Sequence, residues 1–217
     1  DAAGTLHLGP PLIPAQECYA PRTTRDPTYE LAYWRYALET AQAWRERAGR
    51  ARNANWDRML ANLAAAPVRD GRYAAVAAEP FTKPDDHPSM LAALGVLPRT
   101  AGIDPATMRR TAAWVEENWQ WESTWGWDSP MLAMTWARCG DPVRAVDALL
   151  HPSPKNRYLP NGHNYQEPRL PVYLPGNGGV LVATALMAAG WDDGPEQSAP
   201  GFPPEWPVRV EGLLRSP

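Results

Sequence analysis

Cysteine, phenylalanine and histidine are scarce in this sequence. Its 217 residues include two cysteines, two phenylalanines and four histidines. Cys18 and Cys139 are too few for a disulfide framework or a four-thiolate zinc site. The histidines, at positions 7, 87, 151 and 163, lack the spacing of zinc ligands. No serine lies in the strand–turn–helix context of a hydrolase nucleophile. The sequence therefore implies no metal and no cofactor.

The chain also lacks an excess of charge and a long apolar run. Lys and Arg number 21 against 24 Asp and Glu, and the two signs are interspersed. No basic tract predicts a nucleic-acid groove or an anionic membrane surface as partner. No apolar run is long enough to predict a membrane-spanning helix. The hydrophobic fraction of 44% is sufficient for the core of one domain. Because Asp1 is not a methionine, we expect a processed chain or part of a longer one.

Proline and tryptophan are abundant, with 25 and 11 residues. Proline at the first helical position after an Asp cap predicts helix starts, and apolar residues three to four apart predict the helices that follow. The predicted helices span residues 28–47, 55–66, 86–95, 106–119, 131–139, 143–150 and 180–189. A short hairpin around Asp70-Gly71 and a short strand over 208–213 are the only strands expected. The fold class is all-α, built of antiparallel helical hairpins.

Loops as long as 7–25, 67–86 and 151–177 usually carry function. Glu17 is a lone acid in a largely neutral part of the first. Beside Ile13 and Cys18 its carboxyl would be desolvated, which would raise its pKa and suit a general acid. The alternative is a loop glutamate paired with Arg22 or Arg25.

Four tryptophans lie within nine residues in the segment 119–127. Indole rings offer a flat apolar face with a hydrogen-bond donor at the edge, which suits sugar rings. Glu122 is the stronger polar candidate among them, because Asp128 is also explained as a helix N-cap. His87 precedes a proline at a predicted helix start, where a histidine is more often a capping or structural residue than a catalytic one.

The segment 156–167 is dense in amide, imidazole and phenol groups, which both donate and accept hydrogen bonds. That chemistry suits polyol recognition, with a polar surface loop as the alternative. The glycine-rich turn 175–179 allows close backbone approach but does not have a nucleotide-binding spacing.

Four segments, in this order, resemble motifs of the α/α-toroid (six-hairpin) glycosidases. Residues 14–17 (Pro-Ala-Gln-Glu) stand where glycoside hydrolase family 95 has Ser-Pro-Glu-Asn and where family 65 has Gly-Pro-Asp-Glu-Tyr. Residues 87–98 align without gaps with the family 95 pattern His-Arg-His-Leu-Ser-His-Leu-Phe-Gly-Leu-Tyr-Pro. Residues 126–141 are similar to a Gly-Trp-Ser segment and a helix ending Ala-Arg-Leu-Gly-Asp. Residues 175–179 resemble Asp-Gly-Asn-Phe-Gly-Gly, one residue shorter.

The resemblance covers most of residues 1–190 and implies the second half of an (α/α)6 toroid, with 191–217 as a proline-rich tail. A complete toroid has six hairpins, about twice the number predicted here. The N-terminal half would then be a separate chain or a missing segment. Pro175 stands where family 95 has an aspartate that works with the base, so fucosidase specificity is not implied. Enzymes of this kind are often exported, which favours a secreted or periplasmic location.

The function implied is hydrolysis of a glycosidic bond in an oligo- or polysaccharide, by inversion. Glu17 would be the general acid. Glu122, or failing it Glu167, would activate water, and its carboxyl group would lie about 6.5–9.5 Å from that of Glu17. The residues expected to contact carbohydrate are Tyr19, Arg25, His87, Trp125, Trp127, Asp128, His163, Asn164, Gln166, Glu167 and Asn177.

Three other functions remain open. A phosphorylase of the same fold would hold phosphate with Arg22, Arg25 and Lys155. A non-catalytic carbohydrate-binding module would use only the tryptophans. A terpenoid-cyclase toroid ranks last, because Asp85-Asp86 lacks the spaced acidic motif that such enzymes need.

Overall fold

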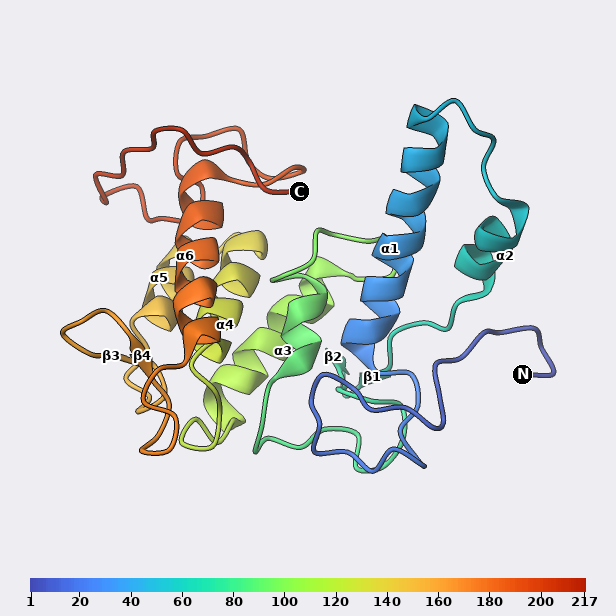
Figure 1. Cartoon of the computed structure of the whole chain (residues 1–217), viewed down its shortest axis with the longest axis horizontal. Helices are drawn as coiled ribbons and strands as arrows, with labels where there is room; N and C mark the ends of the chain where they lie inside the picture. Colours follow the sequence, from blue (N-terminus) through green and yellow to red (C-terminus); the bar gives the residue numbers. More distant parts are fainter.

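The computed structural model describes all 217 residues and is predominantly helical, as the sequence predicted (Figure 1). Two small antiparallel hairpins are the only sheets. The α-helices are α1 (Thr28–Arg47), α2 (Ala54–Asn62), α3 (Pro105–Asn118), α4 (Asp128–Arg138), α5 (Pro142–Leu149) and α6 (Leu174–Ala189). The other elements are the 3-10 helix η1 (Ser89–Ala93) and the strands β1 (Val68–Arg69), β2 (Arg72–Tyr73), β3 (Arg157–Tyr158) and β4 (Asn164–Tyr165).

Helix α4 is the centre of the fold. Its residues from Asp128 to Ala137 are all buried, and it packs against α3, α5, α6 and η1. Trp136 is fully buried, and the guanidinium groups of Arg109 and Arg144 cover its ring. The central core is therefore apolar on the inside and sealed by cations that lie flat on an aromatic face.

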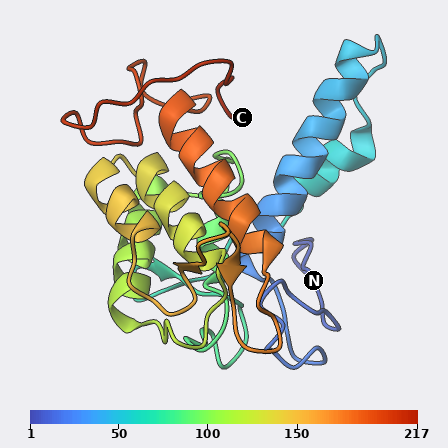
Figure 2. The same ribbon diagram turned by 60° about the vertical axis from the view of Figure 1, so that its left-hand side comes forward.

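Helices α1 and α2 form a hairpin that projects away from this core (Figures 1 and 2). The first turns of α1 bury Leu31 and Ala32, and α1 packs against η1. Further along, buried Gln42 joins the two helices, donating to the carbonyl of Asn53 and accepting from its N–H. Beyond that point α1 is largely exposed, with 68% of Trp44 accessible.

Two of the predicted aspartate caps are confirmed, and those at Asp26 and Asp128 are wrong. Asp128 is itself the first residue of α4, and its carboxylate caps no N–H of that helix. Asp104 and Asp141 accept hydrogen bonds from the N–H groups three residues on, at the starts of α3 and α5. Asp26 instead has a left-handed backbone, with φ of 47°, and does not cap α1. Its carboxylate accepts from the N–H of Leu8 and lies 2.6 Å from Nδ1 of His7. This aspartate therefore fastens the N-terminal loop to the start of α1.

Several predicted boundaries also differ. Helix α6 begins at Leu174, six residues earlier than expected, because the glycine-rich segment 175–179 is itself helical. The segment 86–95 forms only the short η1, and α2 ends at Asn62. The tail has no strand over 208–213, and a single bridge joins Trp191 to Ser216.

The long connections gather at one end of the helices. In Figure 1 the segments 9–25, 78–88, 119–127 and 151–173 lie together below the helical layer. They come from distant parts of the sequence, and each contains residues that the sequence singled out. This end of the molecule is where a site can be assembled.

Candidate functional site

The loop that carries Glu17 is fixed to the segment around Lys83. Gln16 is fully buried, and its Nε2 donates to the carbonyl of Lys83 at 2.7 Å. The N–H of Lys83 donates to the phenol oxygen of Tyr19 at 2.9 Å, and its Nζ donates to the carbonyl of Cys18 at 2.7 Å. Tyr19, expected to contact substrate, is thus a buried structural group. These bonds hold Glu17 next to the chain leading to His87.

Glu17 itself is exposed. The desolvation expected from Ile13 and Cys18 is not provided within this chain, since Ile13 is 68% accessible and Cys18 is only half-buried. Glu30, which sequence reasoning missed, supports the same loop from α1, where its carboxylate accepts the N–H of Ala15. Burial raises the pKa of Glu30. Its position in an amphipathic helix gave no signal, because the contact depends on the path of the loop.

His87 forms a buried pair with Asp128, 41 residues away in sequence. Nδ1 of His87 lies 2.9 Å from Oδ1 of Asp128. Asp128 is fully buried, and its Oδ2 accepts the N–H of Trp125 at 2.9 Å. Burial lowers the pKa of His87, but the hydrogen bond to Asp128 and the charges of Asp128, Asp86 and Glu17 raise it by more. Burial raises the pKa of Asp128.

The charge of Glu17 is the smallest of the named influences that raise the pKa of His87, and no hydrogen bond or ion pair joins the two side chains. Asp86, which was considered only as part of a diacid, belongs to the cluster around His87. Its Oδ1 accepts the indole N–H of Trp125 at 3.2 Å and lies 3.8 Å from Nε2 of His87. The cluster therefore holds two carboxylates and one imidazole, those of Asp86, Asp128 and His87, and the exposed Glu17 acts on it only through its charge.

Aromatic rings surround this group. The ring of Trp127 meets that of His87 edge-on at 5.1 Å, and the ring of Trp125 lies 5.8 Å from it. Tyr173, from the turn before α6, lies 5.5 Å from Trp125. Burial, followed by the charges of Asp128 and Asp86, raises the pKa of Tyr173 to about 12. Trp125 and Trp127, which the sequence proposed as carbohydrate contacts, thus lie beside His87, together with a tyrosine that the sequence did not single out.

Nδ1 of His87 has two competing partners. The indole Nε1 of Trp127 lies 2.9 Å from it, the same distance as Oδ1 of Asp128. The indole N–H only donates, so it bonds an unprotonated Nδ1, whereas a protonated Nδ1 donates to the carboxylate of Asp128. The orientation of Trp127 is thereby coupled to the position of a proton.

Two amides predicted to bind carbohydrate instead bind the protein. Asn164 is fully buried, and its Nδ2 donates to the carbonyls of Lys155 and Arg157. Gln166 accepts the N–H of Gly126 through Oε1 and donates to the carbonyl of Thr124 through Nε2. These contacts hold the 151–173 segment against the tryptophan segment.

Glycines on both sides allow Asn164 to fit. A Cβ at position 126 or at position 176 would lie 2.6 Å from Cγ of Asn164. Oδ1 of Asn164 has no hydrogen-bond partner. The amide is therefore packed between two backbones, and the two glycines are required by this close approach.

The remaining candidates are spread around the site. Asn177 accepts from the N–H of Asn164 and donates to the carbonyl of Gly162. His163 is half-buried, with Nδ1 unpartnered. Glu167 pairs with Arg169, and Arg25 is an exposed residue paired with Asp26.

Glu122, the predicted base, does not join the cluster around His87. It is exposed and acts on the electrostatics of His151, which stacks on Trp121 at 4.5 Å. Burial lowers the pKa of His151, and Glu122 opposes that shift. Two of the three cations proposed to hold phosphate contact different parts of the chain. Lys155 donates to the carbonyl of Gln166, and Arg25 donates to the carboxylate of Asp26.

No group of three or more histidine, cysteine, aspartate or glutamate side chains is arranged to hold a metal ion. None of the helices combines the length and the apolar character needed to cross a membrane.

A scan against protein-family models finds no match to this chain, and a search of curated proteins finds no match either.

Proposed function

We propose that this chain is part of a glycoside hydrolase and supplies the general acid of its active site, Glu17. The observation that carries the proposal is the cluster around His87. Hydrogen bonds from the Glu17 loop to Lys83 hold this exposed carboxylate beside the segment that leads to His87, whose imidazole is paired with the buried Asp128. No protein donor hydrogen-bonds the Glu17 carboxylate, so it is available to a substrate oxygen.

The aromatic rings beside this cluster support a sugar as the substrate. Trp125 and Tyr173 are half-buried neighbours, and the ring of Trp127 meets that of His87 edge-on. Apolar ring faces with polar edges match the alternation of C–H faces and hydroxyl rims on a pyranose. Asp86 and Trp125 are joined by a hydrogen bond, which fixes one ring of this surface.

In the proposed reaction Glu17 gives its proton to the leaving glycosidic oxygen as the bond from that oxygen to the anomeric carbon breaks. A second carboxylate takes a proton from water, whose oxygen bonds to the opposite face of the anomeric carbon. Asp86 is our first choice for that base, because it lies in the cluster whereas Glu122 lies beside His151. Inversion requires about 6.5–9.5 Å between the two carboxyl groups when substrate is bound.

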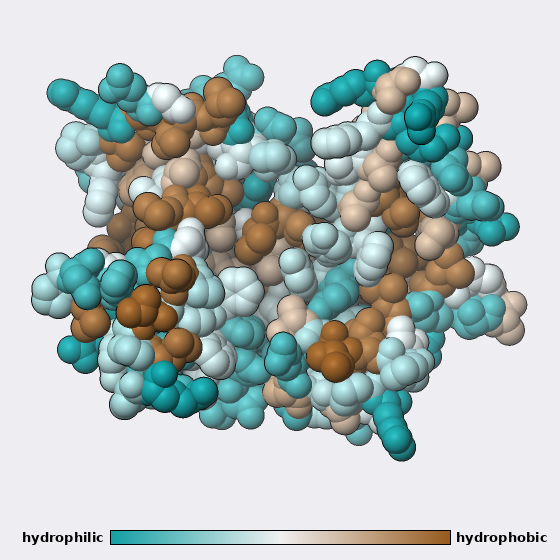
Figure 3. Space-filling view, viewed as in Figure 1, coloured by the Kyte–Doolittle hydropathy of each residue, from teal (hydrophilic) through white to brown (hydrophobic).

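We further propose that a second set of helices, the other half of a toroid, covers the apolar faces of α1 and α6. Helix α6 contains no charged residue, yet Leu174, Leu181 and Val182 are 64%, 71% and 55% accessible. Helix α1 exposes Trp34 and Trp44. Figure 3, in the view of Figure 1, shows apolar surface on both sides of the hollow that separates α6 from α1. A helix apolar on all sides is normally buried, and such a cover would also desolvate Glu17.

The decisive experiment measures turnover of an oligosaccharide panel by the complete assembly, with and without phosphate. Glu17→Gln should lower turnover by about two orders of magnitude or more, and Asp86→Asn by a similar factor. Asp85→Asn, one residue away, is the matched control and should retain activity. Phosphate-dependent turnover would favour the phosphorylase. Glycan binding without turnover, unchanged in Glu17→Gln, would replace the enzyme by a binding module.

A further inference from the structure

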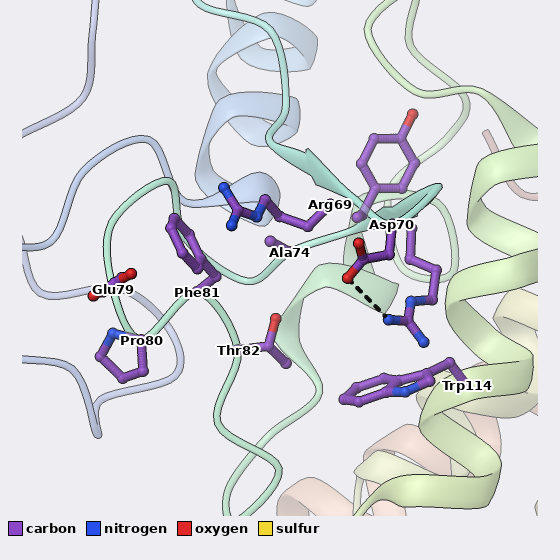
Figure 4. A pocket seen from close by; sticks show the side chains of 10 residues that line it. Arg69, Asp70, Ala74, Glu79, Pro80, Phe81, Thr82 and Trp114 are labelled. Carbon is purple, nitrogen blue, oxygen red and sulfur yellow. Dashed lines mark ion pairs between the residues drawn. The ribbon is translucent and has the colours of Figure 1, made fainter.

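A second cavity, separate from the His87 cluster, lies beside the first hairpin. Its volume is about 680 Å³. The β1–β2 hairpin forms one wall, the segment 79–82 forms another, and Trp114 of α3 closes the base (Figure 4). None of its lining residues belongs to the proposed site. A volume in this range is typical of small-molecule sites and far exceeds that of a single inorganic anion.

Two arginines line this cavity without a side-chain hydrogen bond to the protein, and Arg72 forms a long ion pair with Asp70. The guanidinium of Arg69 lies 3.8 Å from the ring centroid of Phe81, and that of Arg72 lies 4.8 Å from the ring of Trp114. Arg69 makes no hydrogen bond or ion pair with the protein. Stacking on rings holds a guanidinium in place, so less freedom is lost when it binds an anion. Both guanidinium groups are thus oriented before a ligand binds.

The rim restricts the kind of anion that fits. Asp70 lies 3.6 Å from Arg72, too far for a hydrogen bond, and its side chain is 85% accessible. Glu79 is a second exposed acid on the rim. The two acids balance the two arginines, which disfavours a densely charged ligand such as a polyphosphate. Isolated carboxylates separated by neutral groups fit better.

Hydroxyl chemistry is present between the arginines. In Figure 4 Thr82 lies between the Arg69 wall and the Trp114 wall. Its hydroxyl oxygen accepts the N–H of Ala75, which leaves the hydroxyl hydrogen free to donate. Large apolar side chains are few, and the rings of Phe81 and Trp114 are already occupied by guanidinium groups. An acidic peptide would find few apolar anchors in this cavity.

We propose that this cavity binds an acidic oligosaccharide, a chain of sugars bearing uronate carboxylates, through Arg69 and Arg72. Each guanidinium would take one carboxylate by two parallel N–H donors. Thr82 and the rim acids would contact sugar hydroxyls. This proposal does not depend on the chemistry of Glu17.

The test titrates the full chain calorimetrically with tetragalacturonate. Maltotetraose, tetraglutamate and inorganic phosphate serve as the neutral, peptide and simple-anion comparisons. Arg69→Met and Arg72→Met should each weaken tetragalacturonate binding by about tenfold or more, and Arg69→Lys should weaken it less. Arg47→Met, which removes an exposed arginine of α1, is the matched control and should bind normally. Circular dichroism checks that each variant is folded.

Glu17→Gln should bind tetragalacturonate as the wild type does, which separates this site from the proposed catalytic one. Saturable binding that depends on both arginines and is absent for maltotetraose would support the proposal. No binding by the folded wild type, or equal binding by the double methionine variant, would overturn it. Tetraglutamate or phosphate binding as tightly as tetragalacturonate would also overturn it, since the site would then select charge and not sugar.

Discussion

Nδ1 of His87 and Oδ1 of Asp128 lie 2.9 Å apart, with the Asp128 side chain fully buried and 14% of the His87 side chain accessible. Burial raises the pKa of Asp128, while Asp128 and Asp86 raise the pKa of His87 against the effect of burial. Both pKa values therefore move upward. The pair keeps one proton between its two members to a higher pH than a free imidazole would.

This pair should make stability depend on pH. An unfolded histidine titrates near pH ~6.5, and the pKa of His87 is raised in the folded state. The folded state then binds the proton more tightly, so the stabilisation is complete below about pH 6.5 and is lost as the pH rises through the folded pKa. Asp128, with its pKa also raised, acts in the same direction.

Urea unfolding of the wild type and of His87→Gln, measured from pH 6 to pH 9, checks this expectation. The free energy of unfolding should fall more steeply with pH for the wild type than for the variant. Parallel curves would mean that His87 contributes no linkage.

Asp128→Asn should lower the pKa of His87. The substitution removes the charge and the carboxylate acceptor that hold the imidazole protonated, while the burial that opposes protonation remains. We expect the imidazole to titrate below the ordinary value of about 6.5. Titration of the His87 ring protons by NMR measures this directly. Asp70→Asn, on an exposed turn, should leave the value unchanged, and an unshifted His87 in Asp128→Asn would contradict the pairing.

Two glycines of α6 should respond oppositely to the same substitution. A Cβ at position 176 would collide with Asn164, whereas a Cβ at position 178 would meet nothing within 4 Å. Gly176→Ala should destabilise the chain by about 1–3 kcal/mol through overpacking. Gly178→Ala should stabilise it by about 0.5–1 kcal/mol, because alanine loses less backbone freedom in a helix. Thermal or urea unfolding of both variants gives the comparison, and changes of the same sign would argue against the Asn164 packing.

Leu181→Glu should leave the chain folded and weaken its association with the proposed covering helices. The side chain is 71% accessible, so an acid there is hydrated in the isolated chain but unpaired and desolvated beneath a partner. Pull-down of the assembly with tagged wild type and variant measures the loss, and glycan turnover should fall with it. Thr184→Glu, one helical turn further along the same exposed face of α6, should weaken assembly in the same way. Normal assembly by Leu181→Glu would contradict the proposal that partner helices cover the apolar face of α6.

Local signals in the sequence predicted most helices and little of the site. Asp104 and Asp141 cap their helices because a cap needs only the next three residues. Asp26 has the same Asp-Pro signature, yet its carboxylate bonds Leu8 and His7, a contact that depends on where a distant loop runs. The start of α6 was missed because glycine has a low helix propensity. The segment is nevertheless helical in the folded chain, where Gly176 packs closely on Asn164.

The same distinction applies to the site. Trp125, Trp127 and Glu17 were proposed as site residues because residue type and local context marked them. Asp86 was set aside because its role depends on Trp125 and His87, which reach it only in the folded chain. Asn164 and Gln166 were correctly seen as unusual polar residues, but sequence alone cannot tell an amide that faces solvent from one that ties two loops together.

The enclosure of Asn164 between Gly126 and Gly176 has a consequence for how this protein can change over time. Three segments that are remote in sequence share one small volume, so a larger residue in one requires a smaller residue in another. Homologues should therefore vary at these three positions in concert or not at all. If the 151–173 segment were transferred to a homologue without the tryptophan segment, the residue at position 164 would no longer fit the residue that it packs against at position 126.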